Sequence, residues 1–372
     1  MRLLLTFAAA VLLCRAAAGA PRDTRNVILI TADGLRWQEL FGGMDPLLKD
    51  AKSAGMQGED TAALRDRLWR SSPEERRQAL MPFFWKTLAP HGVVLGNLTK
   101  GSSMRVTNAF RVSYPGYSEI LTGRAQDGAI RGNDAIRNPV PTVLEFVRKK
   151  LGLNASQVAL FGSWDMFQLI GEHTPGSVFI NSGYRALDPE PASPRLRELN
   201  AMQFDVLTPW PSARHDYITF EMALEYLKTQ RPRFLYIALD ETDDWAHDHR
   251  YDRVLDVIGY LDRCLRKLWD AVEDSPDYRG HTMLVITCDH GRGSSLENWH
   301  SHGKDVPEAA QIWAAFIGPD TPTTGQAANV PEVFQRDITP TILDLLGLDY
   351  RDYEGVMGKP IAIAIREKAA TP

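Results

Sequence analysis

Cysteine is scarce in this chain of 372 residues, which contains only Cys14, Cys264 and Cys288. A disulfide-rich scaffold and a cysteine-based zinc module are therefore excluded, because both need clusters of cysteines. Cys264 lies in a helical pattern and Cys288 ends an apolar run. We expect both to be small buried residues, and the sequence leaves a disulfide between them open.

An excess of positive charge is also missing. The chain has 42 Lys and Arg against 47 Asp and Glu, which is a formal net charge of −5. A net negative charge does not attract the chain to nucleic acid or to an anionic membrane. We therefore expect no nucleic-acid partner.

Long apolar runs are confined to the start of the chain. Arg2 precedes an apolar run over residues 3–13, and small residues follow at 18–20. This order is typical of a cleaved signal peptide over residues 1–20, and the run is too short to cross a bilayer as a helix. The sequence therefore predicts an exported protein, either periplasmic or secreted.

The mature chain of residues 21–372 is predicted to form one domain without a transmembrane segment. Cleavage would remove Arg2 and Arg15 but no acid, so the formal charge would change from −5 to −7. An uncleaved membrane anchor is the alternative. A lipid anchor on Cys14 fits less well, because a large residue, Leu13, precedes it.

Five short apolar runs predict buried parallel strands, because they are rich in large apolar residues without clean alternation. The runs cover residues 26–31, 158–161, 234–239, 283–288 and 312–317. Helical patterns cover residues 142–150, 220–228 and 251–272, the last with an apolar stripe at helical spacing. Alternating strands and helices predict a doubly wound α/β fold, with a mostly parallel central sheet and helices on both faces.

Two stretches interrupt this pattern. Residues 42–80 are crowded with charges, and Pro73 and Glu74 can open a helix there, so we expect a helical insertion over one edge of the sheet. Residues 181–215 contain five prolines close together and are predicted to form a cap or lid loop.

Acidic residues and histidines follow several predicted strands. Asp33 follows the first run, Asp289 and His290 follow the fourth, and His300 and His302 come shortly after. Each feature alone also fits a polar turn. Because ligands bind at the carboxyl ends of strands in open α/β sheets, we expect these side chains to meet at one rim. Carboxylates and imidazoles together predict a metal site there.

The third apolar run leads into an acidic segment with several candidate ligands. Asp243 and His247 are four residues apart, so they would share one face of a helix. Asp244 and Asp248 would share another face and fit a capping or solvated role. Asp240 could instead hold the imidazole of a ligand.

Residues 112–123 predict a short helix, with Ser113 as its N-cap, Pro115 in its first turn and Gly123 at its end. Capping alone would explain Ser113. A helix N-terminus also attracts phosphate, and a serine there can attack phosphorus if a metal lowers the pKa of its hydroxyl.

Together these residues resemble the alkaline phosphatase superfamily, most of all its type I phosphodiesterase and nucleotide pyrophosphatase branch. The matching motifs are, in order, Asp33-Gly34, Ser113-Tyr114-Pro115, Asp243 with His247, Asp289-His290-Gly291 and His302-Gly303. The resemblance extends over residues 26–361, where residues 337–347 resemble the closing helix of the superfamily.

The resemblance implies an alkaline-phosphatase-like fold and two divalent metal ions, with Zn²⁺ favoured over Mn²⁺. It implies one ion held by Asp243, His247 and His302, and a second held by Asp33, Asp289, His290 and Ser113. Ser113 would attack a small-molecule phosphate ester and form a phospho-enzyme intermediate. Asn133 stands about where the superfamily places an Asn that holds a phosphate oxygen, although Asn133-Asp134 also fits a turn.

Departures from the branch concern the substrate class. Ser stands at position 113 where the branch more often has Thr, Gly116 replaces the usual Asn, and Trp245-Ala246 replaces two small residues. Tyr117 stands where the sulfatase branch needs Arg, which disfavours formylglycine chemistry.

Phosphodiesters or phosphomonoesters are therefore the predicted substrates. Sulfate esters, phosphonates and a non-catalytic exported role in binding metal or anions are the alternatives. His302 is preferred to His300 as a ligand because Gly303 follows it directly. His215 and His249 are expected to lie on the surface or to support the ligands.

Overall fold

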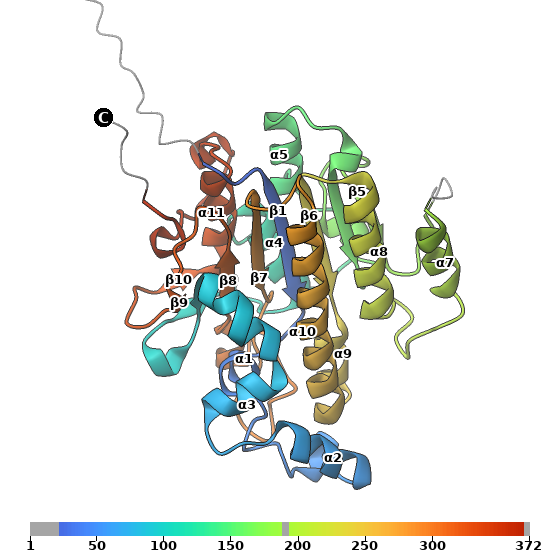
Figure 1. Cartoon of the computed structure of the whole chain (residues 1–372), viewed down its shortest axis with the longest axis vertical. Coiled ribbons are helices and arrows are strands. Elements are labelled where there is room, and N and C mark those ends of the chain that lie inside the picture. The colour runs from blue at the N-terminus through green and yellow to red at the C-terminus, as the bar shows by residue number, and fades with distance from the viewer. Residues whose placement is uncertain (1–21, 188–192, 368–372) are drawn as a thin grey trace, which may run out of the picture.

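The computed structural model describes residues 22–187 and 193–367, so the predicted signal peptide over residues 1–20 lies outside the described residues. Within them, eight strands form one central sheet in the order β5-β4-β6-β1-β7-β8-β2-β9 (Figure 1). The strands are β1 (Asn26–Ala32), β2 (Gly92–Leu95), β4 (Val158–Gly162), β5 (Phe179–Ser182), β6 (Phe234–Leu239), β7 (Thr282–Thr287), β8 (Ala314–Ile317) and β9 (Gly325–Gln326). A second sheet pairs β3 (Met104–Arg105) with β10 (Val333–Phe334).

The predicted apolar runs are the central strands. β1, β4, β6, β7 and β8 occupy these runs, and all their residues are buried, as expected for strands covered on both faces. β1 pairs in parallel with β6 and β7, and β4 pairs in parallel with β5 and β6. The mostly parallel α/β fold is therefore confirmed.

The run over residues 312–317 was wrongly expected to be parallel. β8 is antiparallel to both β7 and β2. A parallel strand would need a crossover to the opposite end of the sheet. The fully described loop between β7 and β8 has only one short helical turn, Pro307–Ala310, so the chain turns back at the end where β7 finishes. This loop carries several of the predicted metal ligands.

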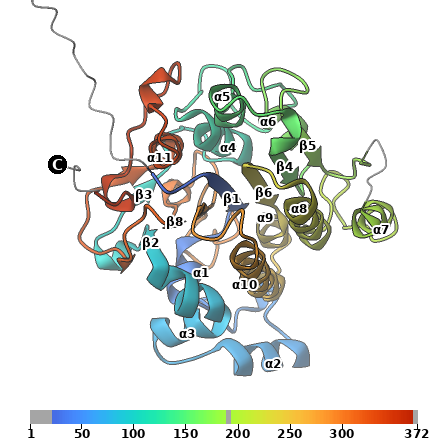
Figure 2. The ribbon, with the colours of Figure 1, turned by 45° about the horizontal axis from the view of Figure 1, so that its top comes forward.

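Helices cover both faces of the sheet (Figure 2). α4 (Ser113–Thr122), α5 (Val143–Lys150), α6 (Phe167–Ile170) and α11 (Ile338–Leu345) lie on one side. α1 (Trp37–Gly42), α8 (Asp216–Gln230), α9 (Glu241–His247) and α10 (Tyr251–Asp274) lie on the other. The helices predicted over residues 142–150, 220–228 and 251–272 are thus present as α5, α8 and α10.

The insertion at residues 42–80 is helical, with α2 (Glu59–Leu68) and α3 (Pro73–Leu80). α3 begins where expected, because Ser72 and Glu75 form a reciprocal capping box before and after Pro73. Figure 1 shows both helices beyond the end of the sheet toward which β1 points.

Residues 181–215 were predicted to form a loop because of their prolines, but they contain a helix, α7 (Pro194–Met202), which is capped by Ser193. The last part of this stretch returns to the sheet, where Arg214 N donates to Ser163 O at 3.0 Å. Residues 188–192 within it lie outside the described residues, and a lid function stays a prediction.

Cys264 and Cys288 are both buried and unpaired in the described part of the chain, as their small apolar role predicts. A search of the described helices finds none that is long and apolar enough to cross a membrane.

Candidate metal centre

The candidate ligands meet because three adjacent parallel strands end at one rim. Asp33 directly follows β1, α9 follows β6, and Asp289 and His290 lie just beyond β7. β1 lies between β6 and β7 in register, so the carboxyl ends of the three strands are neighbours. The parallel pairing therefore brings together side chains that lie more than 200 residues apart in the sequence.

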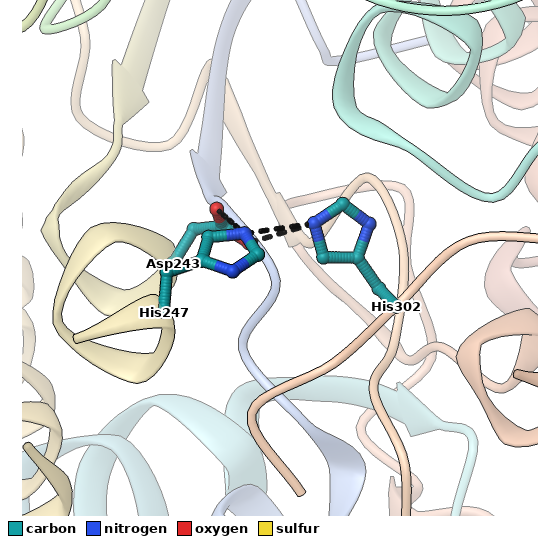
Figure 3. Close-up of side chains that lie close together, drawn as sticks. All are labelled: Asp243, His247 and His302. Carbon is teal, nitrogen blue, oxygen red and sulfur yellow. Dashed lines mark hydrogen bonds and ion pairs between the residues drawn. The ribbon is translucent and has the colours of Figure 1, made fainter. Parts of the chain in front are cut away.

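One group consists of Asp243, His247 and His302 (Figure 3). Asp243 and His247 lie one turn apart on α9, with 3.0 Å between Asp243 Oδ2 and His247 Nε2. His302 reaches them from the loop between β7 and β8, and its Nε2 lies 3.0 Å from His247 Nε2. The three side chains point toward a common centre in an arrangement that suits one cation.

Asp33, Asp289 and His290 form a second, more deeply buried group. His290 Nε2 lies 3.4 Å from Asp33 Oδ1 and 3.3 Å from Asp289 Oδ2. Neither of these carboxylate oxygens has a hydrogen-bond partner among the residues that the structure describes. Burial, and then the neighbouring Asp33, raises the pKa of Asp289 to about 8. Two buried carboxylates with unpaired oxygens fit a divalent cation, which would neutralise them.

The two groups are adjacent. The rings of His290 and His302 stack with centroids 4.0 Å apart, and His290 Nε2 lies 3.7 Å from Asp243 Oδ1. All six ligand-type residues predicted from the sequence are therefore gathered at one place, and their role as ligands stays a prediction.

The imidazoles are oriented as metal ligands usually are. Nδ1 of His290 donates to the carbonyl of Gly291 at 3.0 Å, and Nδ1 of His302 donates to the carbonyl of Arg111 at 3.1 Å. These bonds place a proton on Nδ1 and turn Nε2 toward the neighbouring carboxylates. Burial, and then the nearby His290, lowers the pKa of both His247 and His302, which favours the neutral form that binds metals.

Ser113 lies against the second group. It is the first residue of α4 and not its N-cap, which is Val112, so the capping prediction was wrong. Its hydroxyl is therefore not engaged as a cap, and Oγ lies 3.4 Å from His290 Nε2. Gly123 ends the helix in a left-handed conformation, as expected.

Asn133 stands at the same helix N-terminus. Its side-chain Oδ1 accepts a hydrogen bond of 2.9 Å from the backbone N–H of Tyr114, the residue after Ser113. The bond fixes the amide beside Ser113 and leaves its Nδ2 group for another acceptor.

Sequence reasoning missed the residues that hold the carboxylates. The Tyr117 hydroxyl donates to Asp33 Oδ2 at 2.9 Å, the Gly34 N–H donates to Asp289 Oδ1 at 3.0 Å, and the Arg292 guanidinium donates to Asp243 Oδ1. Tyr117 could have been found, because it follows Ser113 by one helical turn. The sequence did not indicate a role for Arg292, since its contact with Asp243 depends on the path of the loop between β7 and β8.

Two glycines of the matched motifs are explained by close packing. Gly34 has φ 57°, and a Cβ there would lie 2.6 Å from Asp243 Oδ1. A Cβ at Gly116 would lie 2.4 Å from the carbonyl oxygen of Asp289. The Gly at position 116, where the resembling branch usually has Asn, therefore lets α4 pack directly on a ligand-bearing segment.

The remaining candidates of the segment play other roles. The carboxyl of Asp240 forms a hydrogen bond with that of Asp244, and burial together with Asp244 raises the pKa of Asp240 well above its usual value. His300 stacks on the exposed His249, with ring centroids 3.7 Å apart, while His215 Nδ1 bonds Glu241 at 3.0 Å. The structure thus groups His302 with the other candidate ligands in preference to His300.

Comparisons with known proteins agree with this fold. Residues 212–350 match the family model described as the Metalloenzyme superfamily. No curated protein is a significant match to the sequence. Among solved structures, the chain is similar to the alkaline phosphatase PafA, with a TM-score of 0.60 and 12% identity over 93% of this chain and 100% of that one.

Two further structures show the same likeness. The phosphonate monoester hydrolase SpPMH from Silicibacter pomeroyi has a TM-score of 0.55 and 15% identity over 94% of this chain and 78% of that one. BT1596, a 2-O GAG sulfatase, has a TM-score of 0.55 and 14% identity over 94% of this chain and 76% of that one. The chain therefore has the fold of these enzymes, and its rim of carboxylates and histidines forms a candidate metal centre. The family match covers residues 212–350, which is less than half of the chain, so membership of the alkaline phosphatase superfamily and of its phosphodiesterase branch stays a prediction.

Proposed function

We propose that this chain is an exported, metal-dependent hydrolase of phosphate esters that acts through a covalent intermediate on Ser113. The position of Ser113 carries the proposal. Its Oγ lies 3.4 Å from His290 Nε2, at the start of a helix. His290 in turn lies beside the buried oxygens of Asp33 and Asp289 that have no hydrogen-bond partner among the described residues. A hydroxyl in this position can be activated by a cation and can reach a phosphate at the helix N-terminus.

The two groups of ligands would hold two divalent cations, of which Zn²⁺ suits the mixture of carboxylates and imidazoles best. Bound cations supply Lewis-acid activation of the serine hydroxyl and neutralise charge on the phosphate. Asp33, Asp289 and His290 would hold the cation nearer to Ser113, and Asp243, His247 and His302 would hold the other.

The chain's own residues would carry out two displacements. In the first, Ser113 Oγ forms a bond to phosphorus as the bond from phosphorus to the ester oxygen breaks, which releases the alcohol. In the second, water attacks phosphorus and the bond to Oγ breaks, which restores the serine and releases phosphate or a phosphomonoester. Splitting the hydrolysis in this way replaces one difficult step by two easier ones.

Charge on the non-bridging oxygens would be met by two kinds of donor. The first N–H groups of α4 have no partner within the helix, as at any helix start. Asn133 is held there by its bond to Tyr114 N, so its Nδ2 group can donate to a phosphate oxygen. Both donors are set in place before the substrate binds.

Phosphodiesters and phosphomonoesters are the proposed substrates. The fold neighbours include a phosphatase, a phosphonate hydrolase and a sulfatase, so the fold does not choose among these classes. The Tyr117 hydroxyl is bonded to Asp33, at the position where the sulfatase branch has Arg, which supports phosphate esters over formylglycine chemistry.

A panel of chromogenic esters tests the proposal. The purified chain, loaded with Zn²⁺ or Mn²⁺, is assayed with bis(4-nitrophenyl) phosphate, 4-nitrophenyl phosphate, 4-nitrophenyl sulfate and a 4-nitrophenyl phosphonate. We expect a phosphate ester to give the highest kcat/KM. Faster turnover of the sulfate or phosphonate would assign the alternative class, and no turnover of any ester would favour a binding protein.

Ser113→Ala tests the covalent step. Turnover should fall by on the order of 10⁴-fold or more, as removal of a covalent nucleophile does, while metal content is largely retained. Ser113→Thr keeps a hydroxyl and serves as the control. Acid-quenched wild type should yield a phosphorylated peptide containing residue 113, and full activity of the Ala variant would contradict the mechanism.

Export is proposed from residues 1–20 alone. Expression of the whole chain with its own N-terminus, followed by N-terminal sequencing of the exported fraction, should find a mature protein that begins at Pro21. Recovery of the intact N-terminus in the membrane fraction would instead show a retained anchor.

A further inference from the structure

Arg292 places a fully buried guanidinium against the metal centre, and only 2% of the residue is exposed. Its Nη2 donates to the carboxylate of Asp243, through Oδ1, and to the backbone carbonyl of Asp243 at 3.1 Å. Its Nη1 donates to the backbone carbonyl of His300. One side chain therefore ties helix α9, which carries Asp243 and His247, to the loop that carries His302.

The backbone at residue 292 is held against the same loop. The N–H of Gly293 donates to Ser301 O at 2.9 Å, and a Cβ at Gly293 would lie 2.2 Å from Asn298 Oδ1. On the opposite side, a Cβ at Gly34 would lie 2.8 Å from Arg292 Nε. The guanidinium is thus enclosed by close packing, and its direction is set by the fold.

Arg292 donates a hydrogen bond to only one of the two carboxylate oxygens of Asp243. Oδ1 accepts from Arg292 and also lies 3.8 Å from His302 Nε2, and Oδ2 lies 3.0 Å from His247 Nε2. The other carboxylates of the centre follow the same pattern, since Tyr117 holds Asp33 and the Gly34 N–H holds Asp289. An oxygen that is held by a protein donor fixes the direction in which the remaining oxygen can bind a cation.

We propose that Arg292 is a positioning residue that assembles the Asp243, His247 and His302 site without building the other site. The inference rests on the proposed function only in so far as the two groups bind cations. Its basis is that Arg292 touches one ligand of this group directly and holds the loop of a second through His300. The carboxylate of Asp33 is held instead by Tyr117, on a different element.

The expected consequence is a selective loss of one cation. Without the guanidinium, Asp243 can rotate and the loop at His300 loses its tie to α9. Loss of a group that orients a metal ligand typically weakens metal binding by about 10- to 100-fold. The cation held by Asp33, Asp289 and His290 should be unaffected, because its ligands keep their own donors.

Arg292→Gln is the test, and Arg214→Gln is the matched control. Arg214 is also fully buried, and its guanidinium bonds Asn181, Gln203 and Thr219 away from the candidate ligands. Removal of a buried guanidinium should lower the free energy of unfolding in both variants. Only a loss of Zn²⁺ binding that occurs in Arg292→Gln and not in Arg214→Gln therefore supports the inference. Zn²⁺ binding is measured by isothermal titration and by metal analysis after dialysis, with folding followed by circular dichroism.

We expect two tightly bound Zn²⁺ ions in wild type and in Arg214→Gln. In Arg292→Gln we expect one tight ion and a second bound about 10- to 100-fold more weakly. Adding His302→Ala to Arg292→Gln should still leave one tight ion, because both changes act on the same site.

Several outcomes would overturn the inference. They are unchanged or tighter binding of both ions in Arg292→Gln, equal loss of both ions, and loss of all tight binding when His302→Ala is added. If the Gln variant does not fold, Arg292→Lys is used, and the same selective weakening is expected because an ammonium group cannot make the forked contact. A wild type that binds no Zn²⁺ would instead refute the proposed function itself, before any variant is compared.

Discussion

The hydroxyl of Tyr117 donates a hydrogen bond of 2.9 Å to Oδ2 of Asp33. Tyr117 lies one turn after Ser113 on the fully buried helix α4, so the element that carries the proposed nucleophile also orients a carboxylate of the candidate metal centre. One rigid element thus positions the proposed nucleophile and orients Asp33, which is what a preorganised site requires.

Tyr117→Phe should therefore weaken metal binding at the Asp33, Asp289 and His290 group by about 10- to 100-fold, and kcat should fall with it. A hydrogen bond to a charged group contributes roughly 1.5–3 kcal/mol, so the fold should survive its loss. Zn²⁺ titration and ester hydrolysis measure the two effects. Tyr236→Phe is the control, because Tyr236 is equally buried but its hydroxyl bonds Thr31 at 3.1 Å. Equal effects in both variants would contradict a specific role for Tyr117.

Gly116→Ala should abolish most activity although it adds one methyl group. The new Cβ would lie 2.4 Å from the carbonyl oxygen of Asp289, so α4 and the segment after β7 would have to separate. A misplacement of about 1 Å can cost on the order of 10²-fold in rate. Gly128→Ala is the matched control, since no atom of the described chain lies within 4 Å of a Cβ placed there. Comparison of kcat and melting temperature checks the prediction, and a fully active Gly116→Ala variant would refute it.

Asn133 offers a test that separates support of the helix from contact with substrate. Asn133→Asp keeps an acceptor for the N–H of Tyr114 but loses the Nδ2 donor and adds a negative charge beside the phosphate. Asn133→Asp and Asn133→Ala should both lower kcat by about 10²- to 10³-fold with unchanged metal content. If Asn133→Asp stays active while Asn133→Ala does not, the side chain serves only to cap α4.

Removal of metal should lower the melting temperature of the wild type. Cation binding at 100 times its Kd adds about 2.7 kcal/mol to the free energy of unfolding, and chelation removes that contribution. It also leaves one buried oxygen each of Asp33 and Asp289, both near His290 Nε2, without a hydrogen-bond partner among the described residues.

For the variant Asp289→Asn, the difference in melting temperature from the wild type should change sign when metal is removed. Above about pH 8, where Asp289 is ionised in the absence of metal, this variant should melt above the metal-free wild type, because one of two buried like charges is gone. With metal it should melt below the metal-loaded wild type, because one ligand is lost. Differential scanning calorimetry with and without chelator measures both comparisons, and parallel behaviour of the two proteins would contradict the assignment of this group.

Local sequence patterns were sufficient for most of the elements. The central strands are continuous apolar runs, and α10 follows its apolar stripe, so burial on both faces or on one face is visible in the residues themselves. The direction of β8 was not visible, because its residues are equally apolar in either direction. The preceding loop decided it, by staying at the end of the sheet where β7 finishes.

The sequence by itself determined the chemistry of the site: the carboxylates and histidines that follow the strands, and the serine at a helix start. Only the tertiary structure decided how they work together, through the Tyr117 bond to Asp33, the packing of Gly116 on Asp289 and the contacts of Arg292. The physical reason is the separation in sequence between the residues that interact. Strand ends and helix starts are properties of neighbouring residues, whereas the donors that orient each carboxylate come from other segments, which adjacent parallel strands bring together at one rim.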